Sequence, residues 1–248
     1  MMQTITPIAA EEKLLASGVY VYFLNDQPTG VTEPWSIHRW PDGSYCTRVE
    51  RDARAAFGTI ILVEAFSHTP LATDGLQRFV VKQFNANHAA TNDVSAAYSF
   101  ADQMCALAVT VARSVNGQAL PREELSLPEN AVVSPLMRVF LGPVIRQVCE
   151  LGKGQPVPVL IPSLENMLDP DTLLRPQFDY RQAALLGNED LEIDGRVWPA
   201  RRFQYLSNHY DAQSQFWLDE ADVLLRYRFH QSAEQVWDTR LTAYQRLA

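Results

Sequence analysis

The sequence has few cysteines, no excess of basic residues and no long apolar run, and each shortage excludes a class of protein. Its three cysteines, Cys46, Cys105 and Cys149, are too few and too widely spaced for a disulfide framework. Lysine and arginine total 21 against 29 acidic residues, which gives a formal net charge of −8. Binding to nucleic acid or to an anionic membrane surface requires a cationic surface. We therefore expect neither partner.

The first residues also lack the pattern of a secretory signal, which places positive charge before an apolar run of about 7–15 residues. No basic residue precedes Lys13, and Glu11 and Glu12 interrupt the region. The longest candidate for a membrane span, residues 132–145, contains two prolines and an arginine. It is shorter than the roughly 20 apolar residues that a span needs. Together with the scattered cysteines, these absences predict a reducing, cytoplasmic location and no membrane insertion.

Sequence signatures of metal, cofactor and nucleophile sites are missing as well. No two histidines are four residues apart and there is no Cys-x-x-Cys pair, so the common zinc spacings do not occur. Gly152-Lys153-Gly154 follows a predicted helix, whereas a phosphate loop lies between a strand and a helix. The chain has no Gly-x-Ser-x-Gly elbow. We expect no cofactor and no metal.

What the chain does have is a core and many strand signals. Its 248 residues are 47% hydrophobic, and sheet-rich single domains commonly reach about 200–250 residues. Runs of β-branched and aromatic residues alternate with turn dipeptides such as Asp42-Gly43 and Asn116-Gly117. The predicted strands are Gly18–Leu24, Trp35–Trp40, Tyr45–Arg51, Phe57–Phe66, Leu76–Phe84, Gln177–Leu186, Leu191–Ile193, Val197–Leu206, Phe216–Leu218, Val223–Phe229 and Val236–Tyr244, with further extended structure within Val94–Val115.

The middle of the chain differs from both ends. Its apolar spacing predicts one main helix from about Ser134 to Leu151, with Ser134 as the cap, Pro135 in the first turn and Gly152 as the stop. The segment Gln155–Pro176 is rich in proline and is predicted to be a largely irregular crossing segment. The pattern as a whole indicates a mainly β protein: a strongly curved antiparallel sheet or half-barrel of roughly ten strands in one domain, residues 1–248.

The strand Thr59–Phe66 is apolar on both faces, whereas a sheet with one face in water should alternate. Something must therefore cover its second face: a helix, another layer or a bound apolar ligand. We expect the proline-rich region around residues 120–176 to fold over one side of the sheet. A curved sheet with an apolar concave side is a natural pocket for a small molecule.

Residues near both ends of the chain carry a family resemblance. They are Gly18, Tyr20, Gly30, Trp35, Asp42-Gly43 and Arg48 in the opening part, and Phe216-Trp217-Leu218-Asp219 and Leu224-Leu225-Arg226-Tyr227 in the closing part. In these features the chain resembles bacterial lipocalin-like or LolA-like half-barrel proteins of uncharacterised function. The resemblance implies a curved antiparallel sheet around a helix or an apolar cavity. Exported members of such folds carry lipids, and this chain departs from them because it shows no export signal.

Candidate catalytic residues are polar side chains on otherwise apolar strands. Glu64 follows four aliphatic residues, and a carboxylate in such surroundings is suited to proton transfer. The alternative is an ion pair with an arginine on a neighbouring strand, such as Arg48. His38 shares a strand face with Trp40 and could act as a general base or hold a substrate hydroxyl. The alternative for His38 is an edge-strand residue beside the Asp42-Gly43 turn.

Candidate binding residues come from both ends of the chain. An inward hydroxyl of Tyr20 or Tyr22 could position a ligand oxygen, and an inward arginine among the closing strands could hold a carboxylate or phenolate by two parallel hydrogen bonds. The alternative for these arginines is a solvated face, paired with Asp219, Asp222 or Asp238. His209-Tyr210-Asp211 is either a functional loop or a solvated turn, and Cys105 is predicted to be a core residue.

These observations support three hypotheses. The first is a cofactor-independent enzyme of the lyase, hydratase or isomerase type, which acts on a small hydrophobic or aromatic molecule in a β-barrel cavity. In it, His38 or Glu64 is the base, and Arg48 and Tyr22 position an oxyanion. The substrate-binding residues are Tyr20, Tyr22, Trp40, Trp217 and Arg226. The second is a non-catalytic carrier of hydrophobic metabolites with the same cavity, and the third is a structural protein whose covered sheet is simply core. The oligomeric state is left open.

Overall fold

The computed structural model describes residues 2–71, 73, 75–85, 93–103, 106–193, 195–208, 210 and 212–247. Within this part the chain forms sixteen strands and two helices. The first half contains β1 (Lys13–Leu24), β2 (Gln27–Arg39), β3 (Tyr45–Ala53), α1 (Arg54–Phe57), β4 (Thr59–Ser67), β5 (Leu76–Asn85), β6 (Val94–Gln103) and β7 (Ala106–Val115). The middle contains β8 (Gln118–Ala119), β9 (Glu123–Ser126), β10 (Val132–Val133), α2 (Arg138–Gly152) and β11 (Val157–Pro162). The last part contains β12 (Pro176–Ile193), β13 (Arg196–Leu206), β14 (Gln215–Leu218), β15 (Leu224–Ser232) and β16 (Gln235–Arg246).

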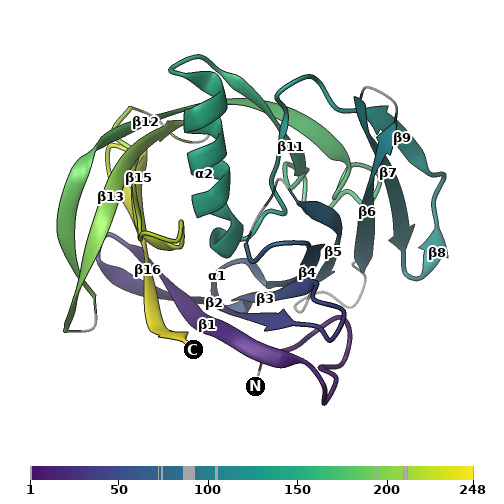
Figure 1. The fold of residues 1–248 in the computed structure, drawn as a ribbon, viewed down its shortest axis with the longest axis horizontal. Helices are drawn as coiled ribbons and strands as arrows, with labels where there is room; N and C mark the ends of the chain where they lie inside the picture. Colours follow the sequence, from purple (N-terminus) through teal and green to yellow (C-terminus); the bar gives the residue numbers. More distant parts are fainter. Residues whose placement is uncertain are drawn as a thin grey trace.

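All sixteen strands belong to one sheet with the order β10-β11-β12-β13-β14-β15-β16-β1-β2-β3-β4-β5-β6-β7-β8, and β9 also pairs with β7. The pairs are antiparallel except for β10–β11. Pairing of β1 with β16 joins the first strand to the last, so the sheet is continuous across the two ends of the chain. Figure 1 shows the sheet curving around α2. The structure confirms the predicted mainly β fold with a strongly curved sheet.

Helix α2 lies on the concave side of the sheet, where it contacts β10, β11, β12 and β15 (Figure 1). Most of its apolar side chains are buried, among them Phe140 and Ile145. At Gly142 the helix approaches the turn before β15 so closely that a Cβ atom would lie 1.9 Å from the carbonyl oxygen of Asp222. Only glycine allows this approach. Neither helix in the described ranges has the length and apolar character that crossing a membrane requires.

The proline-rich crossing segment covers another part of the concave face. The Tyr98 hydroxyl on β6 donates a hydrogen bond of 2.8 Å to the carbonyl oxygen of Leu174. Arg113 on β7 donates from Nη2 to the carbonyl oxygens of Pro170 and Asp171, at 2.7 and 3.0 Å. These bonds give main-chain carbonyl oxygens of the crossing segment partners on the sheet. The region expected to fold over the sheet does so.

The convex face is covered by the segment before β1, which the sequence analysis did not anticipate. The Gln3 main-chain N–H and side-chain amide donate to the carboxylate of Glu50, at 2.7 and 3.0 Å. The Thr6 N–H and hydroxyl donate to the carboxylate of Glu64, at 2.8 and 2.7 Å. Every residue of β4 is buried as a result of these two covers. This is the physical reason for the apolar pattern on both faces of Thr59–Phe66.

The strand count differs from the roughly ten predicted, and the differences have local causes. Gln177–Leu186 and Leu191–Ile193 belong to one strand, β12, because Gly187 absorbs a register shift without breaking the ladder. The segment Val94–Val115 is two paired strands, β6 and β7. Strand β11 lies in the segment Gln155–Pro176, which was expected to be largely irregular, and the short strands β8, β9 and β10 lie where no strand was predicted. Prolines fit β11 because its neighbour β10 is only two residues long and pairs with just part of it.

The main helix begins at Arg138 instead of Ser134, and it ends at Gly152, one residue beyond the predicted Leu151. The Ser134 N–H donates to the carbonyl oxygen of Leu160 and so belongs to the edge of the sheet. Leu136 has a φ of 76°, which no helix accommodates. The chain therefore turns sharply before the helix starts, and this turn places Arg138 at the N-terminus of α2.

Substitution Gly142→Ala should destabilise the protein by about 3 kcal/mol, because the added methyl group would overlap a main-chain oxygen that cannot move freely. Chemical denaturation measures the free energy of unfolding. Leu151→Ala, which truncates an exposed side chain in the last turn of the same helix, is the control and should change stability by less than about 0.5 kcal/mol. Equal effects of the two substitutions would contradict the close approach.

Candidate functional site

The predicted catalytic residues lie together on the convex face of the sheet. Register places Arg48 on β3 opposite Glu64 on β4, and Arg48 Nε lies 3.5 Å from Glu64 Oε1. Glu12, from the segment before β1, accepts two hydrogen bonds from the Arg48 guanidinium, at 2.5 and 2.9 Å. His38 Nδ1 lies 3.5 Å from the same Glu12 carboxylate, and His38 Nε2 lies 3.0 Å from Ser36 Oγ. The predicted Arg48–Glu64 ion pair is therefore present, with Glu12 as an additional partner.

This convex cluster is screened from water and tightly paired. The Arg48 and Glu12 side chains are fully buried. Burial acts to raise the pKa of Glu12, but the hydrogen bonds from Arg48 and from the Ala9 N–H hold that pKa below its usual range. Burial and the nearby Arg48 charge lower the pKa of His38, so its imidazole is neutral near pH 7. Because side chains alternate along a strand, the cluster faces away from α2 and the concave side.

The predicted binding residues separate into different places. The Tyr20 hydroxyl donates to the carbonyl oxygen of Leu224, inside the core. Trp40 packs edge-on against Phe66 on the convex face. Arg226 makes a two-point ion pair with Asp238, at 2.9 and 2.5 Å, which is one of the pairings considered for the closing arginines.

Trp217 lies beside this pair and does not reach the concave cavities. Its indole N–H donates to Glu189, and the Arg226 guanidinium lies 5.4 Å from its ring centroid. Of the predicted binding residues, Tyr22 lines the first of the two cavities on the concave side of the sheet. His209, Asp211 and Cys105 lie outside the described residues. Tyr210 is described, and its ring packs edge-on against Phe216.

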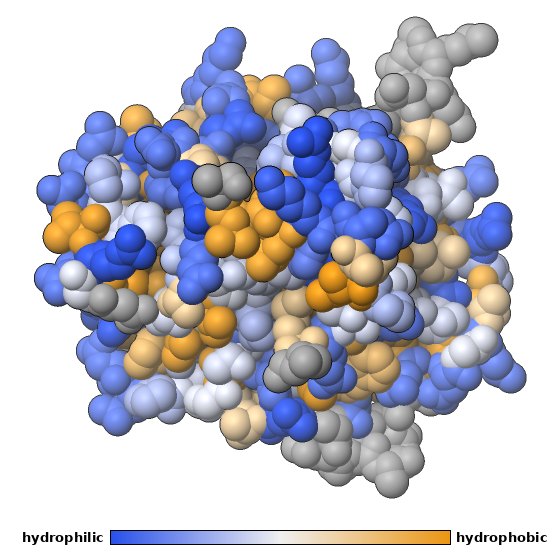
Figure 2. All heavy atoms as spheres, turned by 60° about the horizontal axis from the view of Figure 1, so that its bottom comes forward, coloured by the Kyte–Doolittle hydropathy of each residue, from blue (hydrophilic) through white to orange (hydrophobic). Residues whose placement is uncertain are grey.

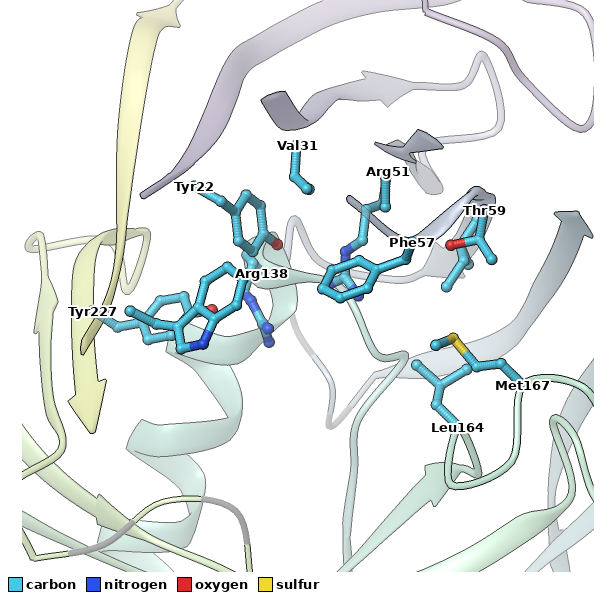
Figure 3. Close-up of a pocket in the computed structure, with 12 residues that line it drawn as sticks. Tyr22, Val31, Arg51, Phe57, Thr59, Arg138, Leu164, Met167 and Tyr227 are labelled. Atoms are coloured by element: carbon cyan, nitrogen blue, oxygen red, sulfur yellow. The ribbon is translucent and has the colours of Figure 1, made fainter. Parts of the chain in front are cut away.

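The concave side holds two adjoining cavities next to the N-terminus of α2. The first has a volume of about 250 Å³ and a mainly apolar lining. Its lining residues are Tyr22, Val31, Arg51, Ala53, Phe57, Thr59, Ile61, Arg138, Leu164, Met167, Tyr227 and Trp237 (Figure 3). The second has a volume of about 350 Å³ and shares Arg51, Arg138 and Leu164 with the first. The two cavities therefore meet where the arginines lie.

Arg138 occupies this junction without a carboxylate partner. Its guanidinium lies 4.8 Å from the ring centroid of Tyr227 and 5.8 Å from that of Tyr22 (Figure 3). Nη1 is 3.5 Å from the Tyr210 hydroxyl, and Nε has no hydrogen-bond partner. Within the described ranges, no carboxylate oxygen lies within 4.0 Å of the guanidinium nitrogens. Arginine stays protonated at any ordinary pH, so the cavity junction carries an unpaired positive charge.

The neighbouring Glu33 is already fully occupied. Its carboxylate accepts hydrogen bonds from the Tyr22 hydroxyl at 2.6 Å, from Arg51 Nε at 2.9 Å and from the Arg138 main-chain N–H at 2.5 Å. Glu33 thereby caps the start of α2 and neutralises Arg51. It is fully buried, both of its oxygens already accept hydrogen bonds, and neither lies within 4.0 Å of the Arg138 guanidinium nitrogens.

The phenols of the cavity stay protonated. Burial raises the pKa of Tyr22 well above its usual range, although Arg51 acts in the opposite direction. Burial likewise raises the pKa of Tyr227, with Arg138 opposing. Both hydroxyls can therefore take part in hydrogen bonds but do not ionise near neutral pH. The described lining of the first cavity includes no carboxylate, histidine or cysteine, so it can hold an anion but offers no evident base.

Sequence reasoning did not identify Arg138, Arg51 or Glu33 as site residues. A signal existed for Arg138, which is the one charged residue in the apolar run 132–145. Alternation along β2 also places Glu33 on the same face as the buried Val31 and Trp35. Across the described ranges, no three His, Cys, Asp or Glu side chains are grouped closely enough to bind a metal ion.

The convex cluster makes stability dependent on pH. The pKa of Glu12 is lower in the folded chain than its ordinary value of 4.5, so its contribution is present above that pH and is lost as pH falls through the folded value. Substitution Glu12→Gln should cost about 3 kcal/mol at pH 7, because it leaves a buried arginine under-paired. The difference from the unsubstituted protein should shrink below about pH 4.

Denaturation curves across pH measure this difference. The matched control is Glu220→Gln, because that side chain is 90% exposed and should have almost no effect at any pH. A Glu12→Gln effect that stays constant from pH 7 to pH 3 would show that the carboxylate charge is not what stabilises the cluster.

No protein-family model and no curated protein matches the chain. Among solved structures, the chain is similar to a β-barrel-like protein of the domain of unknown function DUF1849 from Brucella abortus, with a TM-score of 0.52 and 9% identity over 95% of this chain and 98% of the other. A DUF1329 family protein from Desulfovibrio piger aligns over 95% of this chain and 85% of the other with 11% identity, and its TM-score of 0.24 carries no argument. The first likeness shows the fold alone: the chain has a β-barrel-like architecture.

Proposed function

We propose that the chain binds a small amphipathic carboxylic acid on the concave side of its sheet, with Arg138 holding the carboxylate. The observation that carries this proposal is the unpaired guanidinium at the junction of two cavities. Arg138 is half-buried and its Nε is buried without a partner, and removing such a group from water is costly unless a partner compensates it. A bound carboxylate would supply that partner through charge-assisted hydrogen bonds.

The start of α2 strengthens the preference for an anion. The N-terminus of a helix carries a partial positive charge from its unpaired N–H groups. The first turn of α2 contains no acidic residue and has no side-chain cap of its own. Among the described residues, Glu33 is the carboxylate bonded there, and Arg51 already neutralises it. Arg138 is thus left without a carboxylate within 4.0 Å among the described residues, which matches a ligand with a single negative charge.

The first cavity suits the apolar part of such a ligand. Val31, Ile61, Leu164 and Met167 contribute apolar side chains to its lining. Phe57 is 54% exposed and stacks on Trp237, with ring centroids 6.4 Å apart. A stacked aromatic pair with one exposed ring, on the lining of a cavity, is a favourable contact for an alkyl chain or an aromatic ring.

Binding is favoured over acid–base catalysis at this site. Lyase or isomerase chemistry needs a free base near the substrate, and the described lining of the first cavity has a holder for an oxyanion but no such base. In the second cavity, Asp179 is paired with Arg181 and Glu165 is exposed to solvent. The lipocalin-like resemblance agrees with a ligand on the concave side. Cys46 and Cys149 are free thiols, which supports a reducing, cytoplasmic location for a carrier or sensor of this kind.

Isothermal titration with octanoate and with octanol at neutral pH tests the proposal. The acid should bind more tightly than the alcohol, and Arg138→Gln should weaken acid binding by about 10–100-fold while it leaves alcohol binding nearly unchanged, as expected for one charge-assisted hydrogen-bonded contact. Arg228→Gln is the matched control, because Arg228 is exposed on β15. Equal affinity of the unsubstituted protein for the acid and the alcohol would contradict the proposal.

A stability measurement separates a binding role of Arg138 from a structural one. In the ligand-free protein, Arg138→Met removes an unpaired, half-buried charge and keeps an apolar side chain of similar length. We expect the free energy of unfolding to stay the same or to rise by about 1–2 kcal/mol. A loss of more than about 1 kcal/mol would indicate that Arg138 is retained for the fold.

A further inference from the structure

Ser36, His38 and Glu12 form a separate chain of contacts on the convex face. Ser36 Oγ lies 3.0 Å from His38 Nε2, and His38 Nδ1 lies 3.5 Å from Glu12 Oε2. A hydroxyl joined to an imidazole, whose other nitrogen faces a carboxylate, has the order of contacts found in serine hydrolases. The same constellation occurs on unrelated folds, so it is recognised by its geometry.

The local structure explains why these three residues meet. Ser36 and His38 are two residues apart on β2 and therefore point to the same side of the sheet. Glu12 comes from the covering segment, and the two hydrogen bonds from Arg48 fix its carboxylate. Nδ1 makes no hydrogen bond, but the negative charge 3.5 Å away favours the tautomer that carries its hydrogen on Nδ1. Nε2 is then left as the acceptor for the Ser36 hydroxyl, and the low pKa of His38 keeps the ring neutral.

An open groove of about 440 Å³ gives access to this arrangement. Ser36 and His38 line it, and Ile8, Leu14 and Pro34 contribute apolar walls. Ser17 lies directly opposite Ser36 in the β1–β2 register and also lines the groove. Figure 2 brings the β1 side of the molecule forward and shows apolar side chains gathered in patches among polar ones on this face. The groove thus offers a nucleophile, a base and a second hydroxyl beside apolar walls.

We propose that this groove hydrolyses small uncharged carboxylic esters, with Ser36 as the nucleophile, His38 as the general base and Glu12 as the residue that positions His38. Ser36 Oγ attacks the carbonyl carbon while its proton passes to His38 Nε2, and the Ser17 hydroxyl donates to the developing oxyanion. The bond to the alcohol oxygen breaks, and that oxygen takes the proton from His38. Water then attacks the acyl group, gives a proton to His38 and releases the acid, and Ser36 Oγ regains the proton.

Two assays on the full chain test this proposal. A fluorophosphonate should phosphonylate the unsubstituted protein, and peptide mass spectrometry should place the adduct on Ser36. Hydrolysis of p-nitrophenyl butyrate should fall by about 100-fold or more in Ser36→Ala and His38→Ala. Ser126→Ala, at an exposed serine on β9, should hydrolyse the ester at the original rate. Circular dichroism verifies that each variant is folded.

Glu12→Gln separates positioning from structural support. Loss of the carboxylate removes a charge that favours the protonated imidazole, so the acid limb of the kcat/KM profile should shift to lower pH along with the fall in rate. Absence of an adduct on the unsubstituted protein, or an adduct at another residue, would overturn the proposal even if the serine variants failed to fold. Ester hydrolysis that persists in folded Ser36→Ala would overturn it as well. Neither result bears on acid binding by Arg138.

Discussion

The buried carboxylate of Glu33 joins the sheet, the helix and the cavity. From β2 it accepts hydrogen bonds from Tyr22 on β1, from Arg51 on β3 and from the main-chain N–H that begins α2. Each of these donors would otherwise lie in apolar surroundings without a partner. Leaving a buried donor unpaired destabilises a protein by more than one hydrogen bond stabilises it. Glu33 therefore fixes where the helix starts relative to the curved sheet. Because the helix starts there, the Arg138 side chain extends into the space between β1, β3 and the crossing segment.

The two covers of the sheet have different consequences for function. On the concave side, α2 and the crossing segment fill most of the space with their own side chains, and the remaining cavities lie where these two covers meet. On the convex side, the cover is a segment without helix or strand, held mainly by carboxylates of the sheet. Such a cover leaves a groove along β1 and β2, which is open to solvent. One sheet can thus carry two chemically different sites, because successive side chains of a strand point to opposite faces of the sheet.

Alternation along strands made part of the site predictable. It placed Tyr22 on a possible inner face. It also suggested ion pairs between Arg48 and Glu64 and between an arginine of β15 and Asp238, and both pairs are present in the structure. Partners that come from distant segments could not be found in this way. Glu12 meets Arg48 across 36 residues, and Glu33 meets the N–H of Arg138 across 105. The helix start was misplaced because Ser134 and Pro135 are good starting residues by local rules, whereas pairing of Ser134 with β11 took precedence.

Comparison of the interior arginines shows why Arg138 differs from the others. Arg51 is paired with Glu33, Arg181 with Asp179 and Arg113 with Glu123. The protein thus neutralises each of these charges from within, as expected where water is scarce. Arg138 has aromatic faces and a distant hydroxyl but no described carboxylate partner. Cation–π contacts offset only a part of the cost of removing a guanidinium from water. A charge left uncompensated among compensated ones is most simply explained by a partner that comes from outside the chain.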